Sequence, residues 1–245
     1  MLEIFAHRGA SGYAPENTIP AFLLAIQQES DGIELDVQLT KDGEIVVIHD
    51  EKINRVSNGR GYVKDYTWKE LQQFSFHNRM PEYEQVKIPT LKEVLDCIKN
   101  TNLRVNIEFK TSVFWYPEIE KKTMKLVQDF SLEDRVLYSS FNHYSIREVQ
   151  RENPHAEVAY LYTDVYLQIE EYAKQTGVTA LHPSIYHIYM EHFLENYKRN
   201  GLTVRVWTVN SEQDILEMLK KEVDGIFTNY PDRAKQLREQ YYTIF

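Results

Sequence analysis

Cysteine is almost absent from this chain, and its scarcity excludes two kinds of site. Cys97 is the single cysteine among 245 residues. An internal disulfide and a cysteine-rich metal centre are therefore both excluded. Cys97 itself lies in a short apolar segment, where we expect it to be a small core residue.

Long apolar runs and a leader pattern are also missing. No stretch is long enough to cross a bilayer, and no charged segment followed by an apolar one stands at the N-terminus. We therefore expect a cytoplasmic protein without stable membrane association.

Positive charge is scarce relative to negative charge. The 28 lysines and arginines face 37 aspartates and glutamates, which gives a net charge of −9. This balance argues against nucleic acid or an anionic membrane as the main partner. A small anionic substrate stays compatible with it, because a metal ion or an arginine can dominate the potential within a site.

Strand-like and helix-like segments alternate along almost the whole chain, a pattern typical of a parallel sheet with helical crossovers. Eight such pairs within 245 residues predict a (β/α)₈ TIM barrel, with residues 1–245 forming a single domain. The expected strands are 2–7, 32–37, 104–109, 136–139, 158–161, 180–182, 203–208 and 225–228. The expected helices are 18–28, 90–99, 117–130, 144–152, 167–176, 190–199, 211–221 and 231–241.

Residues 50–89 interrupt this alternation after the second strand and a short apolar segment, 44–48. A structureless loop of that length is uncommon in a compact domain. We therefore expect a small inserted subdomain over one mouth of the barrel. Within it, Thr67 and Glu70 have the spacing of a capping box at the start of a short helix.

The acids of the second and third expected strands form the most informative cluster. Glu34 and Asp36 are two residues apart, so their carboxylates point to one face of a strand. Such a pair is usually a solvated strand face, but it also suits Mg²⁺ or Ca²⁺, which prefer oxygen ligands. Glu108 is a third candidate ligand, and Lys110 shares its strand face as a neighbouring cation.

Two histidines stand at strand ends close to these acids. His7 follows one apolar segment and His49 follows another. Imidazole suits proton transfer near neutral pH, and the adjacent Arg8 carries donors that fit a phosphate group. His182 also ends a strand and is a candidate substrate contact. Active sites of such barrels gather at the C-terminal ends of the strands.

The chain resembles the glycerophosphodiester phosphodiesterase family over most of its length, from Ile4 to Pro231. The matching motifs are His7-Arg8-Gly9, Pro15-Glu16-Asn17-Thr18, Ile33-Glu34-Leu35-Asp36-Val37, Thr40-Lys41-Asp42-Gly43, His49-Asp50, Ile107-Glu108-Phe109-Lys110 and Trp207-Thr208-Val209-Asn210.

The resemblance implies a TIM-barrel enzyme of lipid and glycerol metabolism that uses a divalent cation, Mg²⁺ or Ca²⁺. Its substrates are glycerophosphodiesters such as glycerophosphocholine, which it hydrolyses to an alcohol and glycerol 3-phosphate. The implied roles are acid/base catalysis for His7 and His49, metal binding for Glu34, Asp36 and Glu108, and substrate binding for Arg8, Lys110 and Trp207.

Two other functions compete with this one. A lysophospholipase D or phospholipase C type enzyme would use similar groups but needs an exposed apolar rim. Only the aromatic run 114–116 and the insertion offer such a rim in the sequence. A binding protein that has kept only the fold would lack a histidine or an acid, and none is missing.

Three weaker signals give expectations about individual residues. His187 has no acids around it and is expected at the surface or at a helix cap. Tyr186, Tyr189 and Tyr197 form a tyrosine stripe that is expected to serve packing rather than ligand binding. Asn229 stands where the family often has aspartate, and as a turn residue it is expected to matter little.

Overall fold

A computed structural model describes residues 1–244 of the chain. The strands are β1 (Glu3–His7), β2 (Gly32–Leu39), β3 (Ile45–Val47), β4 (Arg104–Phe109), β5 (Val136–Ser140), β6 (Glu157–Tyr162), β7 (Ala180–Pro183), β8 (Thr203–Val206) and β9 (Gly225–Thr228). The α-helices are α1 (Ile19–Gln27), α2 (Trp68–Leu71), α3 (Leu91–Ile98), α4 (Ile119–Asp129), α5 (His143–Glu152), α6 (Ile169–Gln175), α7 (Ile185–Ile188), α8 (Phe193–Arg199), α9 (Glu212–Lys220) and α10 (Pro231–Ile244). Short 3₁₀ turns span Val63–Asp65, Pro81–Tyr83 and Glu133–Arg135.

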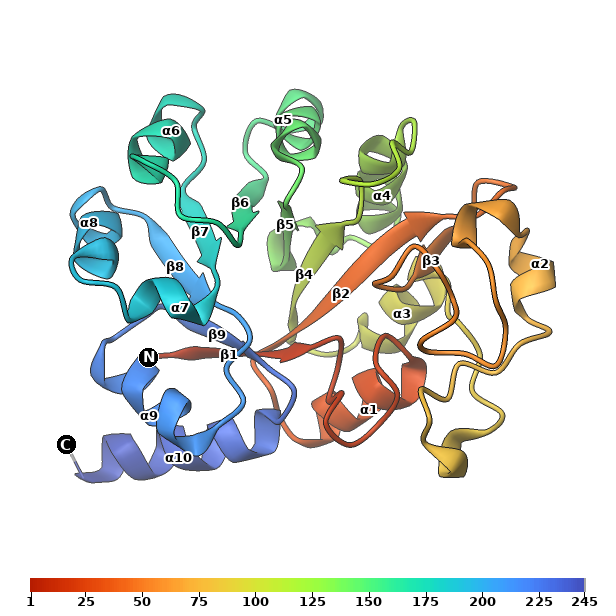
Figure 1. The fold of residues 1–245 in the computed structure, drawn as a ribbon, viewed down its shortest axis with the longest axis horizontal. Coiled ribbons are helices and arrows are strands. Elements are labelled where there is room, and N and C mark those ends of the chain that lie inside the picture. Colours follow the sequence, from red (N-terminus) through yellow and green to blue (C-terminus); the bar gives the residue numbers. More distant parts are fainter. Residues whose placement is uncertain (245) are drawn as a thin grey trace.

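Eight parallel strands close into a barrel, as predicted. Their order is β1-β9-β8-β7-β6-β5-β4-β2, and the pairing of β1 with β2 completes the ring. Figure 1 shows the helices on the outside of these strands. The short β3 pairs antiparallel with β2 and leads into residues 50–89.

Strand β2 shows why this sequence positions a site inside the barrel. All eight of its residues are buried. Ile33, Leu35 and Val37 belong to the main hydrophobic core, whereas Glu34 and Asp36 alternate with them and occupy the other face. The strand therefore secures its place in the barrel by its apolar residues and presents its acids inward.

Helix starts agree with the sequence signals. Thr90 accepts a hydrogen bond from the Glu93 amide while the Glu93 carboxylate accepts one from the Thr90 amide, so α3 begins with the predicted capping box. Thr67 and Glu70 form the same arrangement at α2. These caps satisfy amides that have no partner within the helix.

Residues 50–89 form a compact unit beside β3, in orange and yellow in Figure 1. A separate hydrophobic cluster holds it together: Val46, Ile48, Ile53, Val56, Val63, Leu71, Phe76 and Ile88. Because Val46 and Ile48 also belong to this cluster, the insertion is anchored directly to the β2–β3 hairpin.

The N-terminal mouth of the barrel is closed by an ionic ring of four side chains. Arg104 contacts both Glu3 and Glu157, and Arg205 contacts the same two glutamates. Arg205 is only 4% exposed, and Phe5 lies beneath both guanidinium groups. A buried charge is stable only when it is paired, and here each charge has two partners.

The structure corrects several expectations. The strand expected over 203–208 ends at Val206, and the single-turn helix α7 was not predicted. His187 is buried, with its Nε2–H donating to the Thr163 carbonyl at 2.9 Å, because α7 turns inward after β7. Tyr197 packs in the core as expected, whereas Tyr186 and Tyr189 are exposed. Cys97 is half-buried against the core.

Across residues 1–244, none of the helices combines the length and the apolar character needed to cross a membrane.

Candidate active site

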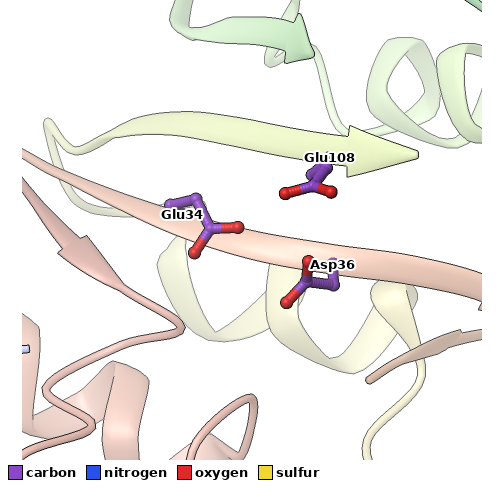
Figure 2. Close-up of side chains that lie close together, drawn as sticks. All are labelled: Glu34, Asp36 and Glu108. Carbon is purple, nitrogen blue, oxygen red and sulfur yellow. The ribbon is translucent and has the colours of Figure 1, made fainter. Parts of the chain in front are cut away.

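Three carboxylates converge at the C-terminal mouth of the barrel. Glu34 and Asp36 come from β2, and Glu108 comes from β4, where it lies opposite Asp36 in the register. One oxygen of each lies within 4.8 Å of the others. Figure 2 shows the three carboxylates turned toward a common space between the two strands.

The protonation tendencies of these acids reflect their crowding. Burial, followed by repulsion from the neighbouring acids, raises the pKa of Glu34 well above its usual range. Burial likewise raises the pKa of Glu108, although Lys110 opposes the shift. Burial acts against ionisation of Asp36 too, but the charges of Arg8 and Lys110 and the hydrogen bond from Asn17 outweigh it and hold the pKa of Asp36 below its usual range.

The acidic cluster fits a divalent cation. Asp36 Oδ1 is buried and lacks a hydrogen-bond partner among residues 1–244, while its other oxygen accepts from Asn17 Nδ2 at 2.8 Å. A bound cation would contact this unpartnered oxygen of Asp36, and its positive charge would favour the ionised forms of Glu34 and Glu108, whose pKa values are raised without it. Three oxygen ligands suit a hard cation such as Mg²⁺ or Ca²⁺.

Arg8 and Lys110 place two positive charges beside the acids. The Arg8 amide donates to Glu34 at 2.8 Å, its Nη1 donates to Glu16 at 2.8 Å, and its Nε lies 3.5 Å from Asp36. Arg8 has a left-handed backbone, with φ 58°, which is uncommon outside glycine. The following Gly9, with φ 79°, packs so closely on α1 that a side chain there would clash with Ala21.

Lys110 connects the acids to one of the two histidines. Its ammonium group donates to Glu108 at 2.8 Å and to His49 Nε2 at 3.1 Å. Lysine has no acceptor, so His49 Nε2 is unprotonated in this arrangement and its proton is on Nδ1. That Nδ1–H then donates to Asp50 at 2.7 Å.

His7 is oriented by a hydrogen bond with Asn229, a residue near the C-terminal end of the chain. Its Nδ1–H donates to Asn229 Oδ1 at 2.8 Å, so Nε2 is free to face the pocket. Burial, reinforced by the Arg8 charge, lowers the pKa of His7 to about 3. The imidazole is therefore neutral at physiological pH. The expectation that Asn229 matters little is wrong, because this turn residue fixes the tautomer of His7.

Arg55 joins the two histidine segments through the insertion. Its guanidinium donates two hydrogen bonds to Asp50, at 2.7 and 3.0 Å, and two to Glu16, at 2.6 and 2.8 Å. Asp50 holds His49, and Glu16 holds Arg8 next to His7. The bridge therefore runs from one candidate proton-transfer group to the other.

A pocket of about 230 Å³ lies between these polar groups and an apolar wall. Phe141, Leu161, Trp207 and Phe227 form much of that wall. Trp207 is fixed by its Nε1–H, which donates to the His182 carbonyl at 2.7 Å, and by an edge contact with Phe141. His182 lines the pocket as a fully buried side chain, and neither ring nitrogen has a hydrogen-bond partner among residues 1–244.

The structure brings all nine side chains singled out in the sequence to one mouth of the barrel. Seven of them line the pocket; Asp36 lies against Arg8 of that lining, and Lys110 contacts Glu108 and His49. Sequence reasoning assigned no role to Glu16, Asn17, Asp50 and Arg55. Glu16, Asn17 and Asp50 lie inside the motifs described above, so the sequence pointed to their positions. Nothing in the sequence around Arg55 indicated a role for it.

A closed parallel barrel with its polar groups gathered at the C-terminal mouth has the architecture of a barrel enzyme, and the two cations here suit an anionic substrate. Residues 7–233 match the Glycerophosphoryl diester phosphodiesterase family. A glycerophosphodiester phosphodiesterase of Bacillus altitudinis is 45% identical over 243 residues, covering 98% of this chain and 99% of that protein. One of Caldanaerobacter subterraneus is 43% identical over 230 residues, covering 94% of each.

Solved structures agree with these relatives. An Oleispira antarctica phosphodiesterase in complex with the product sn-glycerol-3-phosphate superposes with a TM-score of 0.91 at 27% identity, covering 97% of this chain and 96% of that one. The chain belongs to the glycerophosphoryl diester phosphodiesterase family, and it is an enzyme, a phosphoric diester hydrolase.

Proposed function

We propose that this enzyme hydrolyses glycerophosphodiesters such as glycerophosphocholine to glycerol 3-phosphate and the free alcohol, with the help of a divalent cation. The observation that carries the proposal is a pair of histidines that line one small pocket together with two acids of the cluster, Glu34 and Glu108. The Oleispira antarctica relative, which holds sn-glycerol-3-phosphate, supports this choice of product.

Glu34, Asp36 and Glu108 would hold the cation. When bound, Mg²⁺ or Ca²⁺ would polarise a phosphate oxygen and offset the negative charge that develops there. Arg8 and Lys110, whose donors lie beside the acids, would bind the remaining phosphate oxygens. The sequence predicts either ion, and a cytoplasmic location likewise stays a prediction of the sequence.

The two histidines would divide the proton transfers. His7 is neutral and presents Nε2 to the pocket, so it is suited to remove a proton from the nucleophile. His49 is oriented by the Asp50 carboxylate through Nδ1, so it would protonate the departing alcohol oxygen from Nε2 once a proton there has replaced the contact with Lys110. The nucleophile adds to phosphorus while the bond from phosphorus to that oxygen breaks.

The apolar wall would receive the glycerol carbons. Trp207 offers a flat face, and the unpartnered ring nitrogens of His182 would meet a glycerol hydroxyl. Such pockets combine an apolar lining with a few placed polar groups. A pure binding protein would not need two oriented imidazoles and is a weaker alternative.

The test is release of glycerol 3-phosphate from glycerophosphocholine with Mg²⁺ or Ca²⁺ and again with EDTA. We expect release that EDTA abolishes and added metal restores, and we expect His7→Ala and His49→Ala to lose it while staying folded. Folded parent protein that releases nothing with either metal contradicts the proposal. ³¹P NMR during turnover separates two nucleophiles, since only attack by the neighbouring glycerol hydroxyl passes through a cyclic phosphate.

A further inference from the structure

A buried glutamine lies directly behind the segment that carries His49. Gln38 follows Glu34 and Asp36 on β2 at the same two-residue spacing, so it shares their strand face one step further along. Its side chain is completely buried, although it belongs neither to the acidic cluster nor to the lining of the pocket. A buried amide is costly unless its polar atoms are hydrogen-bonded, so the partners of Gln38 indicate its role.

The nitrogen of the Gln38 amide faces three successive backbone carbonyls. Nε2 lies 3.2 Å from the oxygen of Ile48, 3.0 Å from that of His49 and 2.9 Å from that of Asp50. Carbonyls of successive strand residues point in alternate directions, so the chain has left the strand geometry of β3 at this point. An amide nitrogen carries two hydrogens, which the three oxygens share. One side chain therefore ties together the turn that contains His49.

The oxygen of the same amide accepts a hydrogen bond from Tyr116. The tyrosine hydroxyl donates to Gln38 Oε1 at 3.0 Å, and the Tyr116 side chain is buried. Because a carbonyl oxygen can only accept, the amide must turn its nitrogen toward the turn and its oxygen toward the hydroxyl. Tyr116 therefore holds Gln38 in the orientation that the turn around His49 requires.

Tyr116 is itself fixed by aromatic contacts with the insertion. It belongs to the run 114–116, which the sequence suggested as an apolar rim. Phe114 packs edge-on against Tyr62 of the insertion, with ring centroids 5.4 Å apart, and its centroid lies 6.4 Å from that of Tyr116. The Lys64 ammonium lies 4.9 Å from the centre of the Phe114 ring. This part of the run therefore packs the connection after β4 against the insertion.

Gln38 supplies a restraint on His49 that the other contacts of this residue do not provide. Asp50 and Lys110 contact the two ring nitrogens and so orient the imidazole. The position of the backbone from which the ring extends depends on the turn that Gln38 ties together. Misplacing a reacting group by about 1 Å can cost about 100-fold in rate.

We infer that Gln38 and Tyr116 are positioning residues for His49 in the step that protonates the departing alcohol oxygen. They contact neither the pocket nor the acidic cluster, so they act through the turn and not on the substrate or the cation. The inference deepens the proposed function and rests on it, because His49 has this role only if the diester is hydrolysed. Losing either side chain should therefore harm most the substrates whose leaving group needs a proton.

Two substrates that differ only in the leaving group test the inference. Choline leaves glycerophosphocholine with a proton, whereas p-nitrophenolate leaves glycerophospho-p-nitrophenol without one, so a misplaced acid slows mainly the first reaction. The variants are Gln38→Met, which keeps the length of the side chain and removes its hydrogen bonds, and the milder Tyr116→Phe. Tyr160→Phe is the matched control, because this buried hydroxyl donates to Thr176 at 2.9 Å and does not line the pocket.

We expect kcat on glycerophosphocholine to fall at least about tenfold in Gln38→Met and about threefold or more in Tyr116→Phe, with KM within about twofold of the parent. On glycerophospho-p-nitrophenol both variants should stay within about twofold of the parent, and His49→Ala should show the same contrast between the two substrates. Tyr160→Phe should match the parent on both.

Equal losses on the two substrates, or no loss on either, overturn the inference, because Gln38 and Tyr116 would then serve only the fold. If Gln38→Met does not fold, Tyr116→Phe decides alone by the same comparison. Parent protein that hydrolyses neither diester refutes the proposed function instead, so the two failures are distinguished.

Discussion

Arg55 allows a direct test of whether the insertion positions the catalytic groups. The side chain touches neither the acidic cluster nor the pocket, yet it holds Asp50 and Glu16 in two paired contacts. Arg55→Met keeps most of the aliphatic length and removes all four hydrogen bonds. The Asp50 carboxylate then loses the partner that fixes its position next to His49, so the imidazole is less well oriented.

The expected magnitude follows from how exposed the bridge is. Charge-assisted hydrogen bonds contribute about 1.5–3 kcal/mol when buried, and exposed ion pairs contribute about 0.2–1 kcal/mol. The Arg55 side chain is 41% exposed while Glu16 is largely covered, so we take about 1–2 kcal/mol for the whole bridge. Since about 1.4 kcal/mol corresponds to a factor of ten in rate, kcat should fall about 5- to 30-fold.

Steady-state hydrolysis of glycerophosphocholine measures the effect. We expect the loss in kcat with KM nearly unchanged, because Arg55 does not contact the substrate pocket. Arg55→Lys should rescue little, since an ammonium group cannot hold two carboxylates with one planar fork. Arg151→Met, which removes an exposed helix pair with Glu148, is the matched control and should stay within twofold of the parent. Arg55→Met with parental kcat on folded protein would refute the reasoning.

Three further predictions concern other parts of the molecule. Asn229→Asp places a carboxylate next to His7 Nδ1 and should raise the pKa of His7 from about 3 by about 1–3 units. The acidic limb of the profile of kcat/KM against pH should therefore move to higher pH. A limb that does not move argues against His7 as the group that must be unprotonated. Glu34→Gln should weaken cation binding about 10- to 100-fold by calorimetry, and parental affinity would remove Glu34 from the ligand set. Arg205→Met should lower the free energy of unfolding by about 2–4 kcal/mol in urea, because two glutamates lose a buried partner, and a change below about 1 kcal/mol would contradict the role given to the ionic ring.

Local sequence patterns were enough to predict the barrel and the core of the site. Alternation along β2 determines that Ile33 and Leu35 face the helices while Glu34 and Asp36 face inward, because side chains two apart share a face. Capping residues such as Thr90 marked helix starts for the same local reason. The placement of active residues at strand ends then follows from barrel topology.

Local sequence patterns could not predict contacts between residues that are far apart in the sequence. Asn229 meets His7 across 222 positions and Arg55 meets Glu16 across 39, so nothing in the spacing indicates either pair. His187 is a related case, because its burial depends on how the single turn of α7 leaves β7. Periodicity reports which face a side chain occupies, whereas these roles depend on what lies across from that face.

The ionic ring lies at the N-terminal mouth, away from the connections at the C-terminal mouth, so substitutions in those connections do not disturb it. Its members, Glu3, Arg104, Glu157 and Arg205, belong to the starts or lower parts of strands, and their ion pairs involve none of the connections after β6 and β7. Replacing residues in those connections leaves every charge of the ring paired. Substitution libraries confined to the exposed positions of residues 163–168 and 184–192, such as Leu167 and Tyr186, should therefore alter which substrates reach the pocket while the barrel still folds, which makes this enzyme a practical starting point for directed evolution of phosphodiester specificity.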